Sequence, residues 1–458
     1  MMKNQNKLHG ENVIPAGYKR TEVGVIPNDW DEINLNSIVS ELEAGVSVNS
    51  IDQVDAYSHG KHILKTSCVS NGHFDGYEKK SILPTDVKRA KCSPVKGGIV
   101  VSRMNTPALV GEVGYVAESN LDSFLPDRLW QMKFKKDVAH NPKWLATLLS
   151  FPPFSKKIKD TATGTSGSMK NISKSAFLSL KLPWPTLKEQ NIIGTALSDA
   201  DALITALEQL IAKKQAIKTA TMQQLLTGRT RLPQFYKYSN ETLKGYATGE
   251  LGHIPVDWEV VTCGEIGKFR GGNGFPTGVQ GQTSGKYPFY KVSDMNNDGN
   301  GIFMSDSNNW ISSNIKKQLG STIFPAGSII FAKVGAAIFL ERKKILTIPS
   351  CIDNNLAAFE LDLTRCEIRF IHYILLNLNF GDYVSTTALP SLSGAVLSKI
   401  KIVLPSIKEQ MAIASILSDM DAEIEMLEKK LAKFHDIKQG MMQQLLTGRI
   451  RLPLDHQP

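Results

Sequence analysis

Lysine and arginine side chains follow short apolar runs at matching places in the two halves of the chain. Residues 95–103 resemble residues 325–333, and each run reads as a turn followed by a short buried strand that ends in a cation. Residues 60–67 and 285–293 are similar in the same way, with one insertion. The four cations at the ends of these runs are Lys65, Arg103, Lys291 and Lys333. Such cations can neutralise phosphate groups, so the arrangement favours a polyanionic ligand.

Further basic residues gather in the same two parts of the chain. They are Lys79, Lys80, Lys88, Arg89, Lys91, Lys156, Lys157, Lys159, Lys316, Lys317, Arg342, Lys343 and Lys344. A solvated surface explains any single cluster, but the presence of clusters in both halves supports a phosphate contact. The formal net charge of +9 and the pI of about 9.1 agree with a polyanionic partner. Over 458 residues this excess is modest, so ordinary solubility remains an alternative.

Two loops of glycine and small hydroxyl residues occupy corresponding positions, at residues 161–171 and 385–394. Backbone N–H groups in such loops can approach a phosphate or a base edge closely. Lys170 and Asn171 close the first loop and are therefore candidates for a nucleic-acid contact. A plain flexible linker is the alternative for both loops.

An internal duplication underlies these correspondences. Residues 185–233 align with residues 405–453 without a gap, and about 28 of the 49 aligned positions are identical. A second echo opens each half, where Asp29-Trp30 matches Asp257-Trp258 at a slightly different offset. Each half therefore has a repeated opening and a repeated closing stretch around a middle that has diverged.

The closing stretches are predicted to be two long helices. Apolar residues recur at alternating steps of four and three, which is the seam of a helix that packs lengthwise on another. The seam residues are Ile193, Leu197, Ile204, Leu207, Ile211, Ile413, Leu417, Ile424, Leu427 and Leu431. The first helix should run from Lys188 to Leu226, about 58 Å at 1.5 Å per residue. Gly228 and Gly448 stand where helices commonly end.

One seam position differs between the copies, with Lys214 in the first and Phe434 in the second. The lysine either extends from the edge of the seam into solvent or helps to fix the register. Homologous halves in the order domain, helix, domain, helix predict a pseudo-two-fold molecule with antiparallel helices. The helices then act as a spacer between two domains, although a merely stabilising bundle remains the alternative.

The predicted fold class is α+β, because the middles contain short strands and the helical runs 144–149 and 370–378. Two mixed α/β domains are separated by the two antiparallel coiled-coil helices. The expected boundaries are an N-terminal tail over 1–16, a first domain over 17–185, a first helix over 186–230, a linker over 231–244, a second domain over 245–405, a second helix over 406–450 and a C-terminal tail over 451–458.

Other classes of protein find little support in the sequence. The five cysteines show no C-x-x-C spacing, and no run approaches 18 apolar residues, so a cytoplasmic protein without a structural metal or a membrane span is expected. Phe151-Pro152-Pro153-Phe154 lacks the polar residue of an amino-methyltransferase motif, and neither G-x-x-x-x-G-K-[ST] nor H-E-x-x-H occurs. The glycine-rich run 271–274 follows no clear strand and opens no predicted helix, so it is not expected to cradle a phosphate.

The repeated stretches resemble the specificity (S) subunits of type I restriction-modification systems. The shared motifs are Lys-Glu-Gln at 188–190 and 408–410, Ser-Asp-x-Asp at 198–201 and 418–421, and Met-Gln-Gln-Leu-Leu-Thr-Gly at 222–228 and 442–448. The Asp-Trp openings are similar to that family as well. The diverged middles correspond to its target-recognition domains, which differ from member to member.

The resemblance implies that this chain is a non-catalytic DNA-recognition subunit. Each target-recognition domain would read one half of a bipartite, asymmetric DNA site, while the helices set the unread gap and dock two modification subunits. Those partners would use S-adenosylmethionine to methylate adenine, and restriction subunits would cleave DNA with ATP and magnesium. No cofactor is expected in this chain itself.

Base recognition typically uses Arg or Lys on guanine and Asn or Gln on adenine. The candidate DNA-binding residues are Lys65, Arg103, Lys156, Lys157, Lys170, Asn171, Arg270, Lys291, Lys333 and Arg342. One alternative is a metal-dependent nuclease built on Asp294, Asp298 and the run 353–355. Another is a scaffold that joins other proteins without reading DNA.

Overall fold

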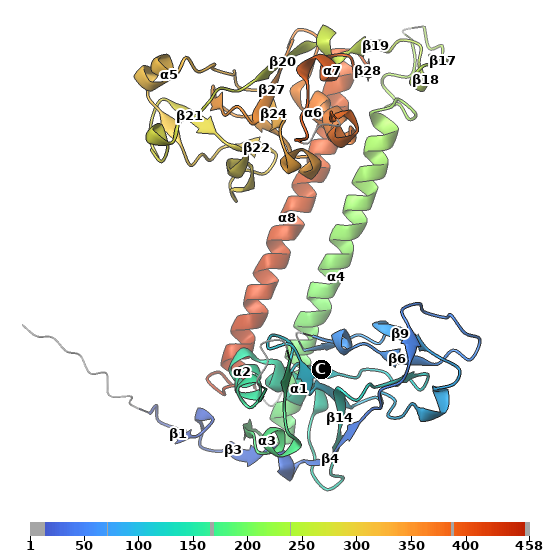
Figure 1. Cartoon of the computed structure of the whole chain (residues 1–458), viewed down its shortest axis with the longest axis vertical. Coiled ribbons are helices and arrows are strands. Elements are labelled where there is room, and N and C mark those ends of the chain that lie inside the picture. Colours follow the sequence, from blue (N-terminus) through green and yellow to red (C-terminus); the bar gives the residue numbers. More distant parts are fainter. Residues whose placement is uncertain (1–13, 71, 165–168, 239, 386–388, 454–458) are drawn as a thin grey trace, which may run out of the picture. The chain divides into compact units, whose positions relative to one another are not determined.

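Figure 1 shows the computed structural model of the chain, which describes residues 14–70, 72–164, 169–238, 240–385 and 389–453. The chain divides into two compact units, and each draws on both repeated helices. Unit 1 comprises residues 1–208 and 430–458, and unit 2 comprises residues 209–429. The fold class is α+β in both, as the sequence predicts.

The main sheet of unit 1 is antiparallel and has four strands. In spatial order they are β12 (Val113–Tyr115), β10 (Ile99–Ser102), β14 (Leu129–Phe134) and β4 (Val39–Ala44). All four residues of β10 are buried because this strand lies inside the sheet. It is the strand predicted before Arg103.

A second sheet of unit 1 forms a smaller lobe, and an apolar cluster that includes Leu64 of the lobe and Val100 of β10 packs it against the main sheet. Its strands are β13 (Ser123–Phe124), β6 (His62–Leu64), β9 (Lys79–Ile82) and β5 (Ser50–Ile51). Two-stranded pairs complete the unit: β1 (Tyr18–Thr21) with β2 (Gly24–Pro27), β3 (Asp31–Asn34) with β16 (Lys181–Trp184), β7 (Val69–Ser70) with β8 (His73–Phe74), and β11 (Met104–Asn105) with β15 (Lys170–Asn171). Its short helices are α1 (Pro142–Ser150), α2 (Pro152–Asp160) and α3 (Lys174–Leu178).

Unit 2 repeats this plan with one additional strand in the main sheet. That sheet has the order β20 (Gly267–Gly271), β27 (Leu356–Leu361), β24 (Ile329–Ala332), β25 (Lys343–Leu346) and β22 (Phe303–Met304). Its lobe contains β23 (Trp310–Ile311), β21 (Tyr287–Tyr290) and β26 (Cys351–Ile352). The pairs are β17 (Tyr246–Gly249) with β18 (Gly252–Pro255) and β19 (Glu259–Thr262) with β28 (Lys401–Leu404), and the short helices are α5 (Ser313–Leu319), α6 (Ile368–Asn377) and α7 (Gly394–Ser398).

The glycine-rich run 271–274 is one place where the sequence prediction was wrong. Strand β20 ends at Gly271, so the run does follow a strand. The strand was missed because Gly-Lys-Phe-Arg-Gly contains a single apolar residue and is bounded by glycines, which are depleted in strands.

The long helices are α4 (Leu187–Leu225) and α8 (Ile407–Leu445). The ends of α4 lie within one residue of the predicted Lys188 and Leu226, whereas the expected helix segments 186–230 and 406–450 extend five residues beyond the last residues of α4 and α8. They run antiparallel within each unit: Lys438 pairs with Asp201 in unit 1, and Lys218 pairs with Asp421 in unit 2. These two ion pairs are equivalent under the 220-residue repeat. Each unit therefore pairs the two helices through equivalent residues.

The predicted seam residues lie on the packed face of the helices. Those that are buried are Ile193, Leu197, Ile204, Leu207, Ile211, Ile413, Leu417 and Ile424, and those that are half-buried are Leu427 and Leu431. Lys214 pairs with Glu423 at 2.7 Å, whereas the side chain of Phe434 is half-buried. The lysine thus stands at the edge of the seam, with its charge paired to the facing helix.

Candidate nucleic-acid interface

Lys65 lies where β6 ends, on the rim of a hollow of about 350 Å³ in unit 1. Lys80, Thr66 and Arg128 share this rim with it. The Lys65 Nζ atom is 3.0 Å from Asp52 Oδ1, and Lys80 Nζ is 3.7 Å from the other oxygen of the same carboxylate. The hydrogen bond from Lys65 to Asp52 raises the pKa of Lys65, so the rim carries positive charge at neutral pH.

Arg103 supports this hollow through a hydrogen bond to Asp127, one of the residues in its wall. Its Nε donates to the carbonyl oxygen of Asp127 at 2.8 Å, and its guanidinium lies 5.7 Å from the ring centre of Trp130. Asp127 and Arg128 line the hollow. The structure therefore brings Lys65 and Arg103 to the same feature, with Lys65 on the rim and Arg103 as a support.

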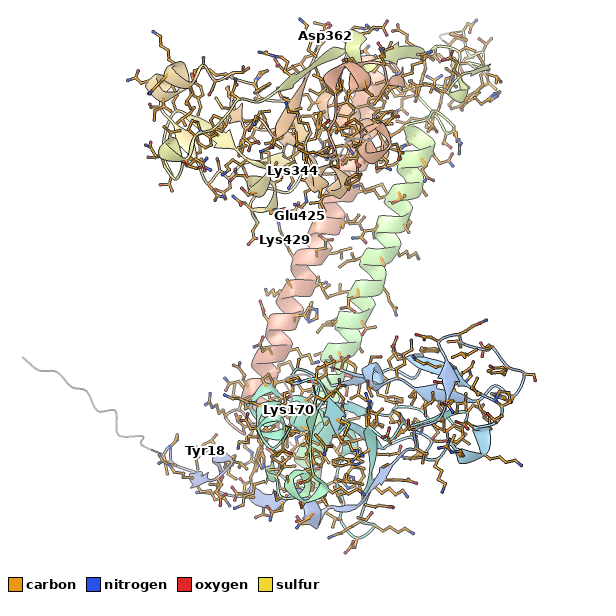
Figure 2. The ribbon with its side chains drawn as sticks, viewed as in Figure 1. Tyr18, Lys170, Lys344, Asp362, Glu425 and Lys429 are labelled. Carbon is orange, nitrogen blue, oxygen red and sulfur yellow. The ribbon has the colours of Figure 1, made fainter. Side chains whose placement is uncertain are left out.

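Lys170 and Asn171 form β15, which pairs with β11 directly after Arg103. Lys170 Nζ donates to the carbonyl oxygen of Gly164 at 3.1 Å, and its position in unit 1 is labelled in Figure 2. The Asn171 Oδ1 atom is buried and lacks a hydrogen-bond donor among the described residues. Residues 165–168 and 386–388, in the middle of the two predicted loops, lie outside the described residues.

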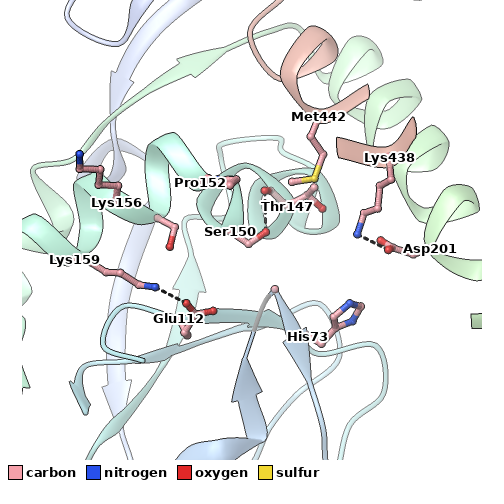
Figure 3. A pocket seen from close by; sticks show the side chains of 12 residues that line it. His73, Glu112, Thr147, Ser150, Pro152, Lys156, Lys159, Asp201, Lys438 and Met442 are labelled. Atoms are coloured by element: carbon pink, nitrogen blue, oxygen red, sulfur yellow. Dashed lines mark hydrogen bonds and ion pairs between the residues drawn. The ribbon is translucent and has the colours of Figure 1, made fainter. Parts of the chain in front are cut away.

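Lys156 lines a separate cleft of about 460 Å³ in unit 1, shown in Figure 3. Thr147 and Ser150 also line the cleft, but their hydroxyl groups donate to the backbone carbonyl oxygens of Lys143 and Thr147 at 2.9 and 3.0 Å. Lys159 Nζ is 2.8 Å from Glu112 Oε1, so this lysine is already paired.

Lys157 follows Lys156 on α2 but takes no part in this cleft. Its Nζ lies 5.2 Å from the ring centre of Phe154, and its side chain is half-buried. The cluster predicted from sequence thus divides, with Lys156 facing the cleft and Lys157 covering an aromatic ring.

In unit 2 the equivalent strand-end cations are Lys291 after β21 and Lys333 after β24. Lys291 Nζ donates to Gln280 Oε1 at 2.9 Å. Lys333 Nζ lies against Gly271, since a Cβ atom on that glycine would stand 2.4 Å from it. Gln280 was not predicted from the sequence, because nothing in its flanking residues marks a glutamine that meets a cation.

The two candidate arginines of unit 2 differ in their surroundings. Arg270 is exposed, pairs with Glu360 at 2.9 Å and lies 5.5 Å from the ring centre of Phe324. Arg342 is half-buried and neighbours Lys343, which is only 3% exposed. Lys343 pairs with Glu341 and donates to the carbonyl oxygen of Leu378 at 3.0 Å, so it is a structural cation.

Asp294 and Asp353, two of the carboxylates offered for a nuclease, serve the local fold. Asp294 is fully buried and accepts hydrogen bonds from the backbone N–H groups of Lys291 at 2.6 Å and Asn308 at 3.0 Å. Asp353 accepts from the backbone N–H of Asn355 at 3.0 Å, while burial raises the pKa of its carboxyl group. The described residues contain no group of three or more His, Cys, Asp or Glu side chains that could hold a metal ion.

The residues repeated in both halves form one clasp in each unit. In unit 2, Arg231 donates to Glu409 Oε2 at 2.6 Å and to Asp257 Oδ1 at 2.7 Å, and Trp258 Nε1 donates to Glu409 at 3.2 Å. Burial opposes the charge of Arg231, but its hydrogen bonds to Glu409 and Asp257 raise its pKa overall. The clasp thus joins the end of α4 and the start of α8 to the opening of the second domain.

Unit 1 contains the same clasp from the corresponding residues. Arg451 donates to Glu189 at 2.8 Å and to Asp29 at 2.9 Å, and Trp30 Nε1 donates to Glu189 at 2.9 Å. Arg231 lies in the predicted linker and Arg451 in the predicted tail, so both segments contribute to packed structure. The same clasp therefore occurs in two units whose strand-end cations differ.

The sequence matches the model of the type I restriction modification DNA specificity domain twice, over residues 27–219 and 255–434. The chain belongs to this family. Its role is DNA sequence specificity within a type I restriction-modification system, and the alternatives of a nuclease or a scaffold are not favoured. The part of the chain that the structure describes has no helix long and apolar enough to cross a membrane.

Members of the family in Methanocaldococcus jannaschii are similar to the chain. The MjaVIII specificity subunit is 27% identical over 308 residues, which cover 64% of this chain and 67% of the relative. The MjaIX specificity subunit is 27% identical over 441 residues, covering 95% and 96%. The crystal structure of a type I S subunit from M. genitalium shares the fold with a TM-score of 0.55 at 18% identity, over 91% of this chain and 96% of that one.

Proposed function

We propose that each domain reads one half of a bipartite, asymmetric DNA site, and that the paired helices set the unread gap between the halves. The observation that carries this proposal is the repetition of one clasp in two units whose strand-end cations differ. The repeated openings and long helices present the two domains in the same manner. The different side chains at the strand ends of these domains then select different bases. Rigid elements hold such side chains better than loops do.

Lys65 and Lys156 in unit 1, and Lys291 and Lys333 in unit 2, are the cations that reach DNA in this proposal. Each lies at a strand end, a hollow or a cleft rather than within a buried pair. Arg103 and Arg270 support the surface through Asp127 and Glu360, and Arg342, which directly precedes β25, contacts phosphates. Lys170 and Asn171 border the loop that approaches the groove.

In this proposal the partner subunits, and not this chain, carry out methylation and cleavage. Two modification subunits dock on the long helices, bind S-adenosylmethionine and methylate adenine in the site that this chain selects. Restriction subunits then use ATP and magnesium to cleave DNA. The match to specificity subunits of other type I enzymes supports this division, because such subunits are named apart from modification and restriction.

Methylation mapping tests the proposal directly. The chain would be expressed with its cognate modification subunit in a host without other adenine methylation, and the genome would be read by single-molecule sequencing. Adenine methylation at a gapped, two-part motif that depends on this chain is the expected result. Methylation that is absent, or unchanged when this chain is omitted, would contradict the proposal.

A further inference from the structure

A short 3-10 helix after strand β24 presents two exposed apolar side chains in unit 2. This helix spans Ala336–Leu340 and lies within residues 335–341, called here the unit 2 tip. Phe339 is 55% exposed and Leu340 is 57% exposed, whereas Ile338 beside them is buried in the core. Two adjacent large apolar side chains that are held in water contribute little to the core, which makes them candidates for a ligand contact.

Hydrogen bonds fix both ends of the unit 2 tip. At its start, the backbone N–H of Gly335 donates to the carbonyl oxygen of Pro390 at 2.8 Å. At its end, the Glu341 carboxylate accepts from the backbone N–H of Gly381 at 3.0 Å. The Phe339 ring lies against Gly381 as well, since a Cβ atom on that glycine would stand 3.1 Å from Phe339 Cδ1. The backbone thus holds the exposed side chains in place before any ligand binds.

Cations flank the unit 2 tip in the sequence. Lys333 lies two residues before the tip and Arg342 follows it directly, and both side chains are half-buried. The carbonyl oxygen of Lys333 accepts from the backbone N–H of Leu392 at 2.9 Å, so the start of the tip lies beside the loop 385–394. Cations that neutralise phosphates bring the side chains between them close to base edges, so the position of the tip suits a DNA contact.

Unit 1 has a tip at the same place in its fold. The carbonyl oxygen of Arg103 accepts from the backbone N–H of Ile172 at 2.9 Å, which is the counterpart of the bond that Lys333 accepts. Val110 is buried in this tip as Ile338 is in the other. The exposed residues of the unit 1 tip are Thr106, Pro107, Ala108 and Leu109. The two tips are therefore anchored alike but present different side chains.

The difference between the tips favours DNA over a protein as the ligand. In the proposed function the two modification subunits are identical, and identical partners need identical surfaces. The two halves of an asymmetric DNA site differ, as the tips do. The exposed apolar pair therefore belongs to the surface that reads the sequence.

We propose that Phe339 and Leu340 contact the 5-methyl group of a thymine in the half-site that unit 2 reads. This inference rests on the proposed function and adds an apolar contact to the cations considered above. Apolar side chains neither donate nor accept hydrogen bonds, and the methyl group of thymine is the apolar group that base edges present in the major groove. Insertion between base steps is less suitable, because the Phe339 ring lies against Gly381 instead of projecting as a wedge.

Binding of short DNA duplexes to the full chain with its cognate modification subunit tests the proposal. The duplexes carry the site found by methylation mapping, and each thymine of both halves is replaced in turn by deoxyuridine, which lacks only the 5-methyl group. Fluorescence anisotropy at one fixed salt concentration measures each affinity. The variants are Phe339→Ala, Leu340→Ala and the two combined, which leave the buried Ile338 in place.

Leu363→Ala is the matched control. Leu363 is 58% exposed, nearly the same as Leu340. It follows β27, which runs antiparallel to β24, so it lies at the end of the main sheet opposite to the tip. Asp362, the residue before Leu363, is labelled in Figure 2.

We expect the wild type to bind one of the deoxyuridine duplexes about fourfold more weakly than the thymine duplex, the effect of burying one apolar carbon. The combined variant should bind these two duplexes equally, because it lacks the side chains that contact the methyl group. Leu363→Ala should discriminate between the duplexes as the wild type does.

Three results would overturn the thymine contact while leaving the proposed function to methylation mapping. The first is a wild-type affinity that no deoxyuridine changes. The second is discrimination that persists in the combined variant, which would assign the methyl group to another residue. The third is a variant that binds every duplex more weakly by the same factor, or that loses a modification subunit in native mass spectrometry. A wild-type complex that does not prefer the mapped site would overturn both proposals.

Discussion

Arg451 Nε donates to Glu189 Oε1 at 2.8 Å across 262 residues of sequence. Glu189 lies in the first turn of α4, where the helix dipole also favours its negative charge. Arg231 and Glu409 make the equivalent contact at the start of α8. The repeated Lys-Glu-Gln motif therefore interacts with a second repeated motif, Arg-Leu-Pro, at residues 231–233 and 451–453.

Removing an arginine of the clasp should destabilise the chain, and more so in unit 2. The side chains of Arg231 and Glu409 are both 2% exposed, so Arg231→Met leaves a buried carboxylate without its partner, at a cost of about 3–5 kcal/mol. The side chain of Arg451 is 37% exposed, so Arg451→Met should cost less, about 1–3 kcal/mol. Urea unfolding measures both, and a larger loss for Arg451→Met would contradict this account.

Gly228 and Gly448 should not tolerate a side chain. Both have φ of +70°, and a Cβ atom would stand 2.6 Å from Pro255 Cδ or 2.5 Å from Pro27 Cδ. Gly228→Ala and Gly448→Ala should each lower the free energy of unfolding by about 1–3 kcal/mol. Gly440→Ala is the control, because its Cβ would meet nothing within 4 Å inside α8 and should stabilise the helix by up to about 1 kcal/mol. Thermal unfolding that ranks the three variants alike would refute the assignment.

Acid should weaken unit 2 through His372. Burial lowers the pKa of this histidine from 6.5 to about 4, and its Nε2 lies 2.8 Å from the carbonyl oxygen of Lys343. The unfolded chain takes up a proton near pH 6.5 while the folded chain does not, so stability falls as the pH drops from 6.5 toward 4. The loss amounts to about 3 kcal/mol at most.

His372→Gln keeps a polar side chain that cannot titrate, so it should flatten this dependence. Ala146 occupies the equivalent position on α1, which gives unit 1 no such group. Urea unfolding at pH 7 and pH 5 would show the difference. An equal pH dependence in the wild type and His372→Gln would rule out this histidine as its source.

Substitution of a lysine that is proposed to contact bases should change sequence recognition in one half of the DNA site. Lys65→Ala should relax or shift recognition in the half read by unit 1, and Lys333→Ala in the other half, each by about 1–3 kcal/mol per affected base. Lys268→Ala, an exposed lysine on β20, provides the comparison. Methylation mapping of the three variants gives the readout, and a uniform weakening of all sites would identify a phosphate contact instead.

The long helices and the strands before the candidate cations can be predicted from the sequence, because the residue patterns that mark them are local and occur in both halves. Heptad spacing predicts α4 and α8, and Gly228 and Gly448 stand three residues beyond the last residues of these helices. The apolar runs before Arg103 and Lys333 predict β10 and β24 for the same reason.

The reading surface is less predictable, because a charged residue looks the same in sequence whatever it meets in space. Lys343 belongs to a basic run, yet it is buried against Glu341 and the ring of Phe380. Arg103 supports a wall through the carbonyl oxygen of Asp127. Arg128, which shares the rim with Lys65, carried no signal in its flanking residues.

The division of the chain into units also sets an order for its synthesis. Unit 2 is a single continuous stretch, residues 209–429, so it can close as soon as those residues have left the ribosome. Unit 1 needs residues from 430 onward for its core, including Leu445 and Leu446. The domain that is translated first must therefore wait, with part of its apolar surface uncovered, until the second has been made.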